Sequence, residues 1–140
     1  MPRTASVTVG TQLPPLKKTI NQRQIDCYSG VRPKSIHTDV EWAKQKGFRA
    51  PLVQALMCTA YVSQMMMTWL GEGFVRGGKI SASFIKPVIV GDTLTAHAAV
   101  TAVDDVDGRP RVTVECWCEN QDGEKTLVGS ASGFADRLRT

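Results

Sequence analysis

PLVQALMCTAYVSQMMMTWL, residues 51–70, is the longest apolar stretch of the 140-residue chain and decides its fold. Apolar residues recur along it at helical steps of three and four, and its other faces are apolar too. A helix that is apolar on every face is normally buried on every face. Pro51 suits the first turn of such a helix, and Gly71 and Gly73 are expected to end it. The sequence therefore predicts one central core helix that other elements wrap.

Length and composition limit the classes of protein to which the chain can belong. The core stretch is long enough to cross a membrane, but polar residues recur within it and no basic flank anchors its ends. With 42% hydrophobic and 21% charged residues, the chain is typical of one soluble domain over residues 1–140. The net charge of +4 comes from scattered basic residues, which disfavours a nucleic-acid partner. The N-terminus has no apolar signal segment, so we expect a cytoplasmic protein.

The four cysteines do not form a metal-binding pattern. Cys116 and Cys118 lie on a strand pattern and point to the same face, while Cys58 lies in the core stretch. No C-x-x-C pair is present, and only His37 and His97 could complete a zinc site. We therefore expect no metal, and thiols that are reduced and mostly buried.

Two short helices are predicted before the core stretch. Asn21 with Gln24 three residues later makes a capping-box variant, and Thr38 with Glu41 makes a second capping box. Each pair places a helix start at its first residue. The expected elements are a loose arm at 1–10, an edge strand at 17–20, a helix at 22–28 and a helix opened by Thr38 and closed by Gly47.

The chain after the core stretch has the alternation that is typical of β-strands. The first expected strand begins at Lys79. Three further strands are expected at residues 94–101, 112–119 and 126–134. Asp122 with Gly123 is a strong hairpin signal, and residues 104–108 form the other expected hairpin turn. Helices followed by an antiparallel meander make an α+β fold.

The predicted core helix sets the shape of this sheet. A helix that is apolar on every side cannot lie on a flat sheet with its back in water. The sheet must therefore curl around the helix, which is the hotdog architecture. Its exposed edges can be covered by a second copy, so we expect a homodimer or a larger homo-oligomer.

Two blocks of sequence resemble one known family. The segment YSGVRPKSIHTDVEWAKQKGFRAPLVQALM, residues 28–57, is similar to the signature region of the MaoC-like family, the (R)-specific enoyl-CoA hydratases and dehydratases with a hotdog fold. The segment FIKPVIVGDTL, residues 84–94, is similar to a later strand and turn of that family. The resemblance covers about residues 19–133. It implies a hydro-lyase that acts on an acyl thioester of coenzyme A (CoA) or of a carrier protein, with no cofactor beyond that carrier.

The resemblance also implies roles for particular positions. In the family, an Asp and a His together hold and deprotonate a water molecule, and the N–H of a glycine at the helix start helps to bind the thioester carbonyl. His37 retains the histidine, but the Asp position holds Arg32, and the family's His-Gly pair is Gln54 and Ala55 here. Ala55 still has its N–H, and a helix N-terminus favours developing negative charge.

His37, Arg32 and Gln54 are the predicted catalytic residues. A histidine can act as a general acid or base near neutral pH. Arg32 stays protonated, so it could hold a carboxylate, phosphate or carbonyl group of a substrate. Gln54 is expected to point into a cavity, since burying an unpaired amide costs about 1–3 kcal/mol. The predicted substrate-binding residues are Ala55, Tyr28, Lys86 and Asp39, of which Asp39 also suits the start of its own helix.

Three functions are compatible with these residues. The first is a MaoC-like hydratase or dehydratase of acyl thioesters with His37 as the main acid and base. The second is a diverged biosynthetic enzyme that performs another proton transfer or hydration on a polyketide-like or acidic substrate, which Arg32 and Gln54 would favour. The third is a non-catalytic acyl-binding module or partner subunit that lacks the family's Asp.

Overall fold

The computed structural model describes residues 7–136, which form five strands and four helices. In chain order these are β1 (Leu16–Thr19), α1 (Gln22–Ser29), α2 (Val40–Gln45), α3 (Ala55–Leu70), α4 (Glu72–Val75), β2 (Lys79–Phe84), β3 (Thr93–Val106), β4 (Arg109–Glu119) and β5 (Lys125–Phe134). Residues 1–6 of the expected N-terminal arm lie outside the described residues. Further along the arm, Gln12 makes a single bridge to Ala99 of β3.

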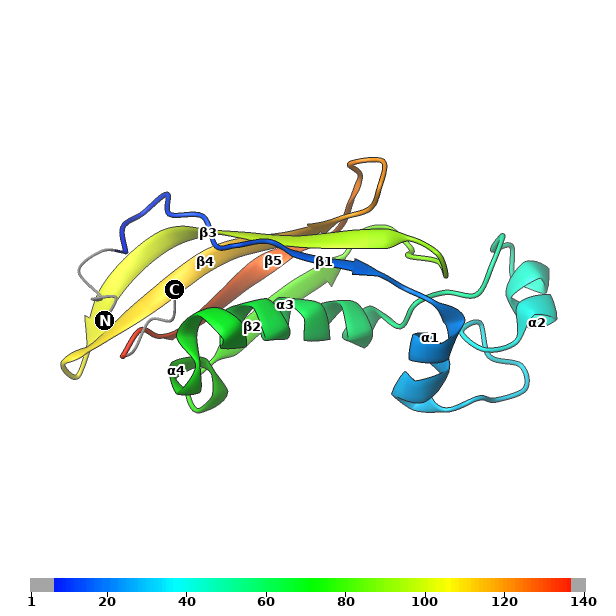
Figure 1. Ribbon diagram of the computed structural model, residues 1–140, viewed down its shortest axis with the longest axis horizontal. Coiled ribbons are helices and arrows are strands. Elements are labelled where there is room, and N and C mark those ends of the chain that lie inside the picture. The colour runs from blue at the N-terminus through cyan, green and yellow to red at the C-terminus, as the bar shows by residue number, and fades with distance from the viewer. Residues whose placement is uncertain (1–6, 137–140) are drawn as a thin grey trace.

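The strands form one antiparallel sheet in the order β1-β3-β4-β5-β2. β3, β4 and β5 make the predicted meander, whereas β2, the first strand after the core helix, joins the far edge beside β5. α3 runs across one face of the curved sheet, and α1 and α2 lie beyond one end of it (Figure 1). This arrangement confirms the predicted α+β hotdog fold.

The hairpins follow from local sequence. The even-numbered residues from 94 to 100 in β3 are buried and alternate with partly exposed residues, as the pattern predicted. The turn after β3 consists of Asp107 (φ 53°) and Gly108 (φ 81°), so it is shorter than the predicted turn at 104–108. Positive φ at both central residues matches the twist of the paired strands, so β3 continues to Val106. The predicted hairpin around Gly123 (φ 74°) is confirmed between β4 and β5.

The first two helices begin with side-chain caps. In α1, the Asn21 N–H donates to Gln24 Oε1 at 2.9 Å and the Gln24 N–H donates to Asn21 Oδ1 at 3.0 Å, which confirms the predicted capping box. α2 is capped by Asp39, whose Oδ1 accepts from the Trp42 N–H at 3.1 Å. The predicted cap at Thr38 is wrong because the hydroxyl of Thr38 bonds back to the loop before it.

The core helix is shorter than the sequence predicted. It begins at Ala55 and not at Pro51, because residues 51–53 are extended and pair with residues 88–90. The Val53 N–H donates to the Val88 carbonyl at 2.8 Å, and the Val90 N–H donates to the Pro51 carbonyl at 2.9 Å. Gly71 (φ 61°) ends the helix as predicted, and the short helix α4 follows it directly.

The burial of α3 is one-sided. Val62 and Met66 are 0% exposed beneath the sheet, whereas Leu56 and Met67 are 66% and 45% exposed. The expectation of burial on every face is wrong for the chain by itself, because the sheet covers only one side of the helix (Figure 1). Across residues 7–136, no helix is long and apolar enough to cross a membrane.

Met66 and Met67 provide a direct test of this one-sided burial. Met66→Ala should lower the free energy of unfolding by about 2–5 kcal/mol, because it removes a fully buried side chain and leaves a cavity. Met67→Ala, the matched change on the face that the single chain leaves exposed, should lower it by less than about 1 kcal/mol at protein concentrations where the chain is monomeric. Urea unfolding of both variants measures the difference. Equal losses would contradict the burial described for α3.

Candidate active site

His37 lies in the loop between α1 and α2 and reaches the segment that leads into α3. Its Nδ1 lies 2.9 Å from the carbonyl oxygen of Leu52. A carbonyl oxygen can only accept, so Nδ1 carries the hydrogen and Nε2 is left with a free lone pair. Ser35 Oγ accepts from the His37 N–H at 3.1 Å, and Gln22 of α1 donates to the His37 carbonyl at 2.9 Å. The main chain and one ring nitrogen of His37 are therefore fixed, and the other nitrogen can exchange a proton.

The loop that carries His37 is held by its own polar side chains. Thr38 Oγ1 accepts from the Arg32 N–H and donates to the Arg32 carbonyl, both at 2.9 Å. Asp39 Oδ2 accepts from the N–H of Lys34, a residue with φ 55°, at 3.0 Å. These backbone N–H groups, first that of Lys34 and then that of Trp42, lower the pKa of the Asp39 carboxyl. The geometry gives Asp39 the helix-start role that the sequence indicated, and its carboxylate holds the loop in shape.

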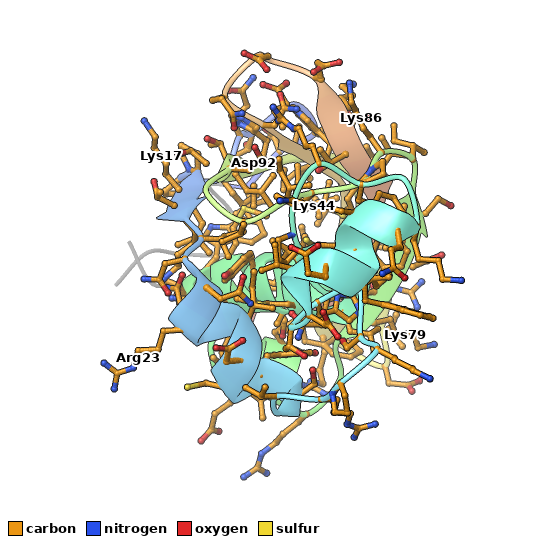
Figure 2. All side chains as sticks on the ribbon, turned by 90° about the vertical axis from the view of Figure 1, so that its right-hand side faces the viewer. Lys17, Arg23, Lys44, Lys79, Lys86 and Asp92 are labelled. Carbon is orange, nitrogen blue, oxygen red and sulfur yellow. The ribbon has the colours of Figure 1, made fainter. Side chains whose placement is uncertain are left out.

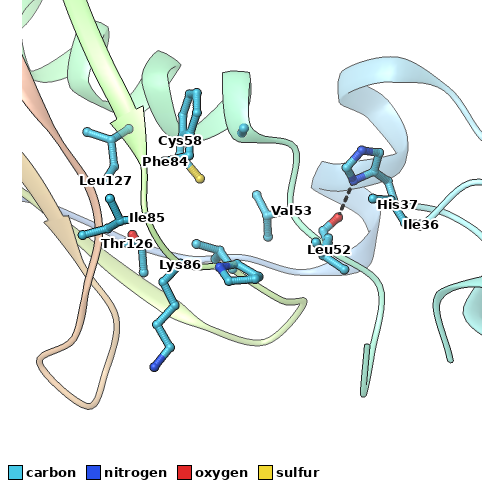
Figure 3. A pocket seen from close by; sticks show the side chains of 13 residues that line it. Ile36, His37, Leu52, Val53, Cys58, Phe84, Ile85, Lys86, Thr126 and Leu127 are labelled. Atoms are coloured by element: carbon cyan, nitrogen blue, oxygen red, sulfur yellow. Dashed lines mark hydrogen bonds between the residues drawn. The ribbon is translucent and has the colours of Figure 1, made fainter. Parts of the chain in front are cut away.

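An apolar cavity of about 350 Å³ opens beside His37 (Figure 3). Its walls are residues 36–37, Leu52, Val53, Ala55 and Cys58 of the core segment, residues 84–88 after β2, and residues 126–127 of β5. His37 and Ala55 share this cavity, so the imidazole and the N-terminus of α3 face the same space. The volume lies in the range of small-molecule sites, which run from about 300 to 1,000 Å³.

Gln54 points away from this cavity. It is 6% exposed, and its Nε2 donates to the Ile25 carbonyl at 2.9 Å and to Ser29 Oγ at 2.8 Å. Its Oε1 is buried and has no hydrogen-bond partner among the described residues. The expectation that Gln54 points into the cavity is therefore wrong, because α1 packs beside the helix start and offers acceptors for the amide.

Lys86 lies at the wall of the cavity, but its ammonium group is engaged elsewhere. The Lys86 Nζ donates to the Glu124 carboxylate, and this contact is the main cause that lowers the pKa of Glu124. Figure 3 shows the Lys86 side chain extending away from the cavity. The positive charge at this wall is therefore already partly balanced.

The structure brings together only part of the predicted set of site residues. His37, Ala55 and Lys86 line the cavity, whereas Arg32 and Tyr28 are exposed and lie outside its walls. The lining also includes Cys58, Phe84, Thr126 and Leu127, which the sequence analysis did not select. Phe84 begins the segment 84–94 that resembles the family, and it could have been selected on that ground. No signal in the sequence marked Thr126 and Leu127 of β5. The methionine run at 65–67 does not line the cavity, and Met65 and Met66 are buried in the core.

These features define a class of protein before any comparison is made. A curled five-stranded antiparallel sheet over a core helix, with a histidine lining an apolar cavity, defines a hotdog-fold protein with a candidate small-molecule site. The family described as MaoC like domain matches residues 5–121, so the chain belongs to the MaoC-like family. Within the residues described here, no group of three His, Cys, Asp or Glu side chains could hold a metal ion.

Individual relatives agree with this membership. The chain is 31% identical over 97 residues to the (R)-specific enoyl-CoA hydratase of Aeromonas caviae, covering 69% of this chain and 70% of that protein. The structure of the A. caviae (R)-hydratase involved in PHA biosynthesis has a TM-score of 0.74 at 25% identity, covering 91% of this chain and 96% of that chain. A structure described as a monoamine oxidase regulatory protein from Archaeoglobus fulgidus has a TM-score of 0.74 at 26% identity, with 97% and 94% covered.

The thiols provide a test of the core and the cavity. Burial raises the pKa of Cys58 and of Cys116 to about 11, and that of Cys118 to about 12. Because only the thiolate reacts, about one Cys58 thiol in a thousand is reactive at pH 8. A disulfide reagent such as DTNB should therefore titrate one thiol rapidly, the exposed Cys27, and the other three slowly.

The matched variant for this titration is Cys27→Ser, which should remove the fast phase and leave the slow phase unchanged. Raising the pH toward 10 should accelerate the slow phase, since each unit increases the thiolate fraction about tenfold below the pKa. A fast phase of more than one thiol per chain in the folded protein would contradict the burial of Cys58, Cys116 and Cys118.

Proposed function

We propose that the protein is a hydratase or dehydratase of acyl thioesters, with His37 as the single acid and base. The observation that carries the proposal is the geometry of His37. One ring nitrogen is fixed by the Leu52 carbonyl, and the ring lines an apolar cavity that also contains the first residue of α3. The 31% identity to a curated (R)-specific enoyl-CoA hydratase supports the reaction class. The reaction requires no cofactor beyond the CoA or carrier protein that bears the thioester.

In the hydration direction, the chemistry needs one base and one site for negative charge. His37 Nε2 takes a proton from water while the water oxygen bonds to the β-carbon of the unsaturated thioester. The electron pair of the double bond moves toward the carbonyl, and the N-terminal N–H groups of α3 at Ala55 stabilise the resulting enolate oxygen. The protonated His37 then donates its proton to the α-carbon. Dehydration is the reverse sequence, with His37 again returned to its starting state.

A second candidate function has one specific observation in its favour. The titratable side chains that line the cavity are His37, Lys86 and Cys58. Lys86 is paired with Glu124, and the pKa of Cys58 is about 11. A site with a single acid–base group also suits an acyl-binding subunit that performs no chemistry. The reading as a different enzyme on an acidic substrate ranks third, because Arg32 and Gln54, which favoured it, do not line the cavity.

The proposal includes assembly of the chain into a homodimer or a larger homo-oligomer. The outer face of α3 exposes Leu56 and Met67, and β2 is a sheet edge whose last residue, Phe84, is exposed. Exposed apolar side chains, and a strand whose outer edge is unpaired, favour association with another copy.

The two histidines make a matched test. His37→Gln should lower kcat/KM for hydration of crotonyl-CoA by about 10²- to 10⁴-fold, the usual contribution of a positioned general acid or base. His97→Gln should leave the rate within about twofold, because His97 lies on β3 stacked against Trp117, with ring centroids 5.4 Å apart, and outside the cavity. Absorbance of the unsaturated thioester follows the reaction.

Thermal unfolding of both variants checks that each still folds. Wild-type turnover that His37→Gln leaves unchanged would remove His37 from the mechanism. Absence of turnover in the wild-type protein, together with measurable binding of acyl-CoA, would favour the acyl-binding subunit instead.

A further inference from the structure

The basic residues are concentrated in one part of the chain, although no run of consecutive residues contains them. Residues 17–49 contain eight Lys or Arg and three Asp or Glu, a net charge of +5, which exceeds the +4 of the whole chain. We call this segment, which comprises β1 from Lys17, α1, the His37 loop, α2 and the residues after it, the basic end. α1 and α2 lie together beyond one end of the sheet (Figure 1). Figure 2 views the molecule from that end and shows Lys17 and Arg23 projecting outward.

The charges of the basic end are not neutralised within the described residues. Outside the segment, four of the six described basic residues have carboxylate partners, and Lys79 and Lys125 do not, whereas none of the eight basic residues of 17–49 has one. The acidic residues of the segment are partly engaged in other ways, since Asp39 binds backbone N–H groups and Asp26 accepts from Gln22 Nε2. The basic end is therefore an uncompensated positive surface.

Apolar side chains are interspersed with these charges. Tyr28 of α1, Val31 of the loop and Val40 of α2 are all exposed. Trp42 is half-buried, and two lysine ammonium groups lie over its ring. Lys46 Nζ is 4.6 Å and Lys34 Nζ is 5.9 Å from the ring centroid. Exposed apolar residues among unpaired charges of one sign are features of a surface that binds a protein of opposite charge.

We propose that the basic end docks an acidic carrier protein that presents the acyl group on a phosphopantetheine arm. This inference rests on the proposed function. The cations flank His37 in the chain on both sides, with Arg32 and Lys34 before it and Lys44, Lys46 and Arg49 after it. A carrier bound there lies beside the cavity into which its thioester must reach.

The distribution of the cations favours a protein carrier over free CoA. The phosphates of CoA are a compact group of charges, and their recognition calls for donors that converge on one point. The basic residues of this end lie on β1, α1, the loop, α2 and the residues after α2, and Figure 2 shows Lys17 and Arg23 projecting outward from separate elements. A spread positive surface matches a spread negative surface, and it accelerates encounter with such a partner at low salt.

The test measures binding of the acidic acyl carrier protein of bacterial fatty-acid synthesis, with and without a crotonyl-phosphopantetheine arm, by fluorescence anisotropy. The variant Lys44→Glu/Arg49→Glu reverses two charges whose side chains make no hydrogen bond or ion pair with the described residues. It should raise the dissociation constant about tenfold. The matched control Arg76→Glu/Lys79→Glu makes the same change in net charge beside α4, at the opposite end (Figure 1), and should change the constant less than about twofold.

Kinetics provide a second readout for the same variants. Lys44→Glu/Arg49→Glu should raise KM for crotonyl-carrier protein about tenfold and leave the kinetics with crotonyl-CoA unchanged, which also shows that the variant folds. No binding of the carrier, equal effects of the two charge reversals, or stronger binding of anionic phospholipid vesicles or of a DNA duplex would overturn the proposal. If the carrier binds as expected but neither thioester is hydrated, the proposed function fails while the docking surface stands. If crotonyl-CoA is hydrated and no carrier binds, the reverse holds.

Discussion

The hydrogen bond of 2.9 Å between His37 Nδ1 and the Leu52 carbonyl joins two of the segments that line the cavity. Leu52 bridges to Ile89, and its neighbour Val53 bonds to Val88, so the accepting carbonyl belongs to a paired, extended segment. α3 begins only three residues after Leu52. The orientation of the ring and the position of the helix N-terminus therefore depend on the same few backbone bonds, which gives the site its two chemical groups in a fixed relation.

This constraint explains why the start of the core helix was predicted incorrectly. From the sequence, Pro51 suits a first helical turn, and nothing local distinguishes residues 51–54 from those that follow. The pairing with residues 88–90 joins segments more than 30 residues apart, so the local sequence around residues 51–54 does not reveal it. The pairing places the helix N-terminus at Ala55, in the wall of the cavity.

Several features set by neighbouring residues could be predicted, although the cap of α2 falls on Asp39 and not on Thr38, whereas individual contacts between distant residues could not. The capping box at Asn21, the stop at Gly71 and the alternation of β3 follow from residues a few positions apart, and the structure contains all three. The outer face of α3 could not be identified, because a helix without a polar face gives no direction to its burial. The direction of Gln54 was missed for a similar reason, since its partner, the carbonyl of Ile25, lies 29 residues away in the chain.

The cavity and the surface around it differ in charge. The cavity is apolar apart from His37, Lys86 and Thr126, and the ammonium of Lys86 is bonded to Glu124, so the cavity suits an uncharged acyl group. Among the described residues, eight basic side chains without a carboxylate partner lie outside the cavity, in the basic end of residues 17–49. Burying such charge beside the thioester would be costly. In the proposed function, charge kept outside the cavity attracts an anionic carrier by complementarity, while the uncharged acyl chain occupies the apolar space beside His37.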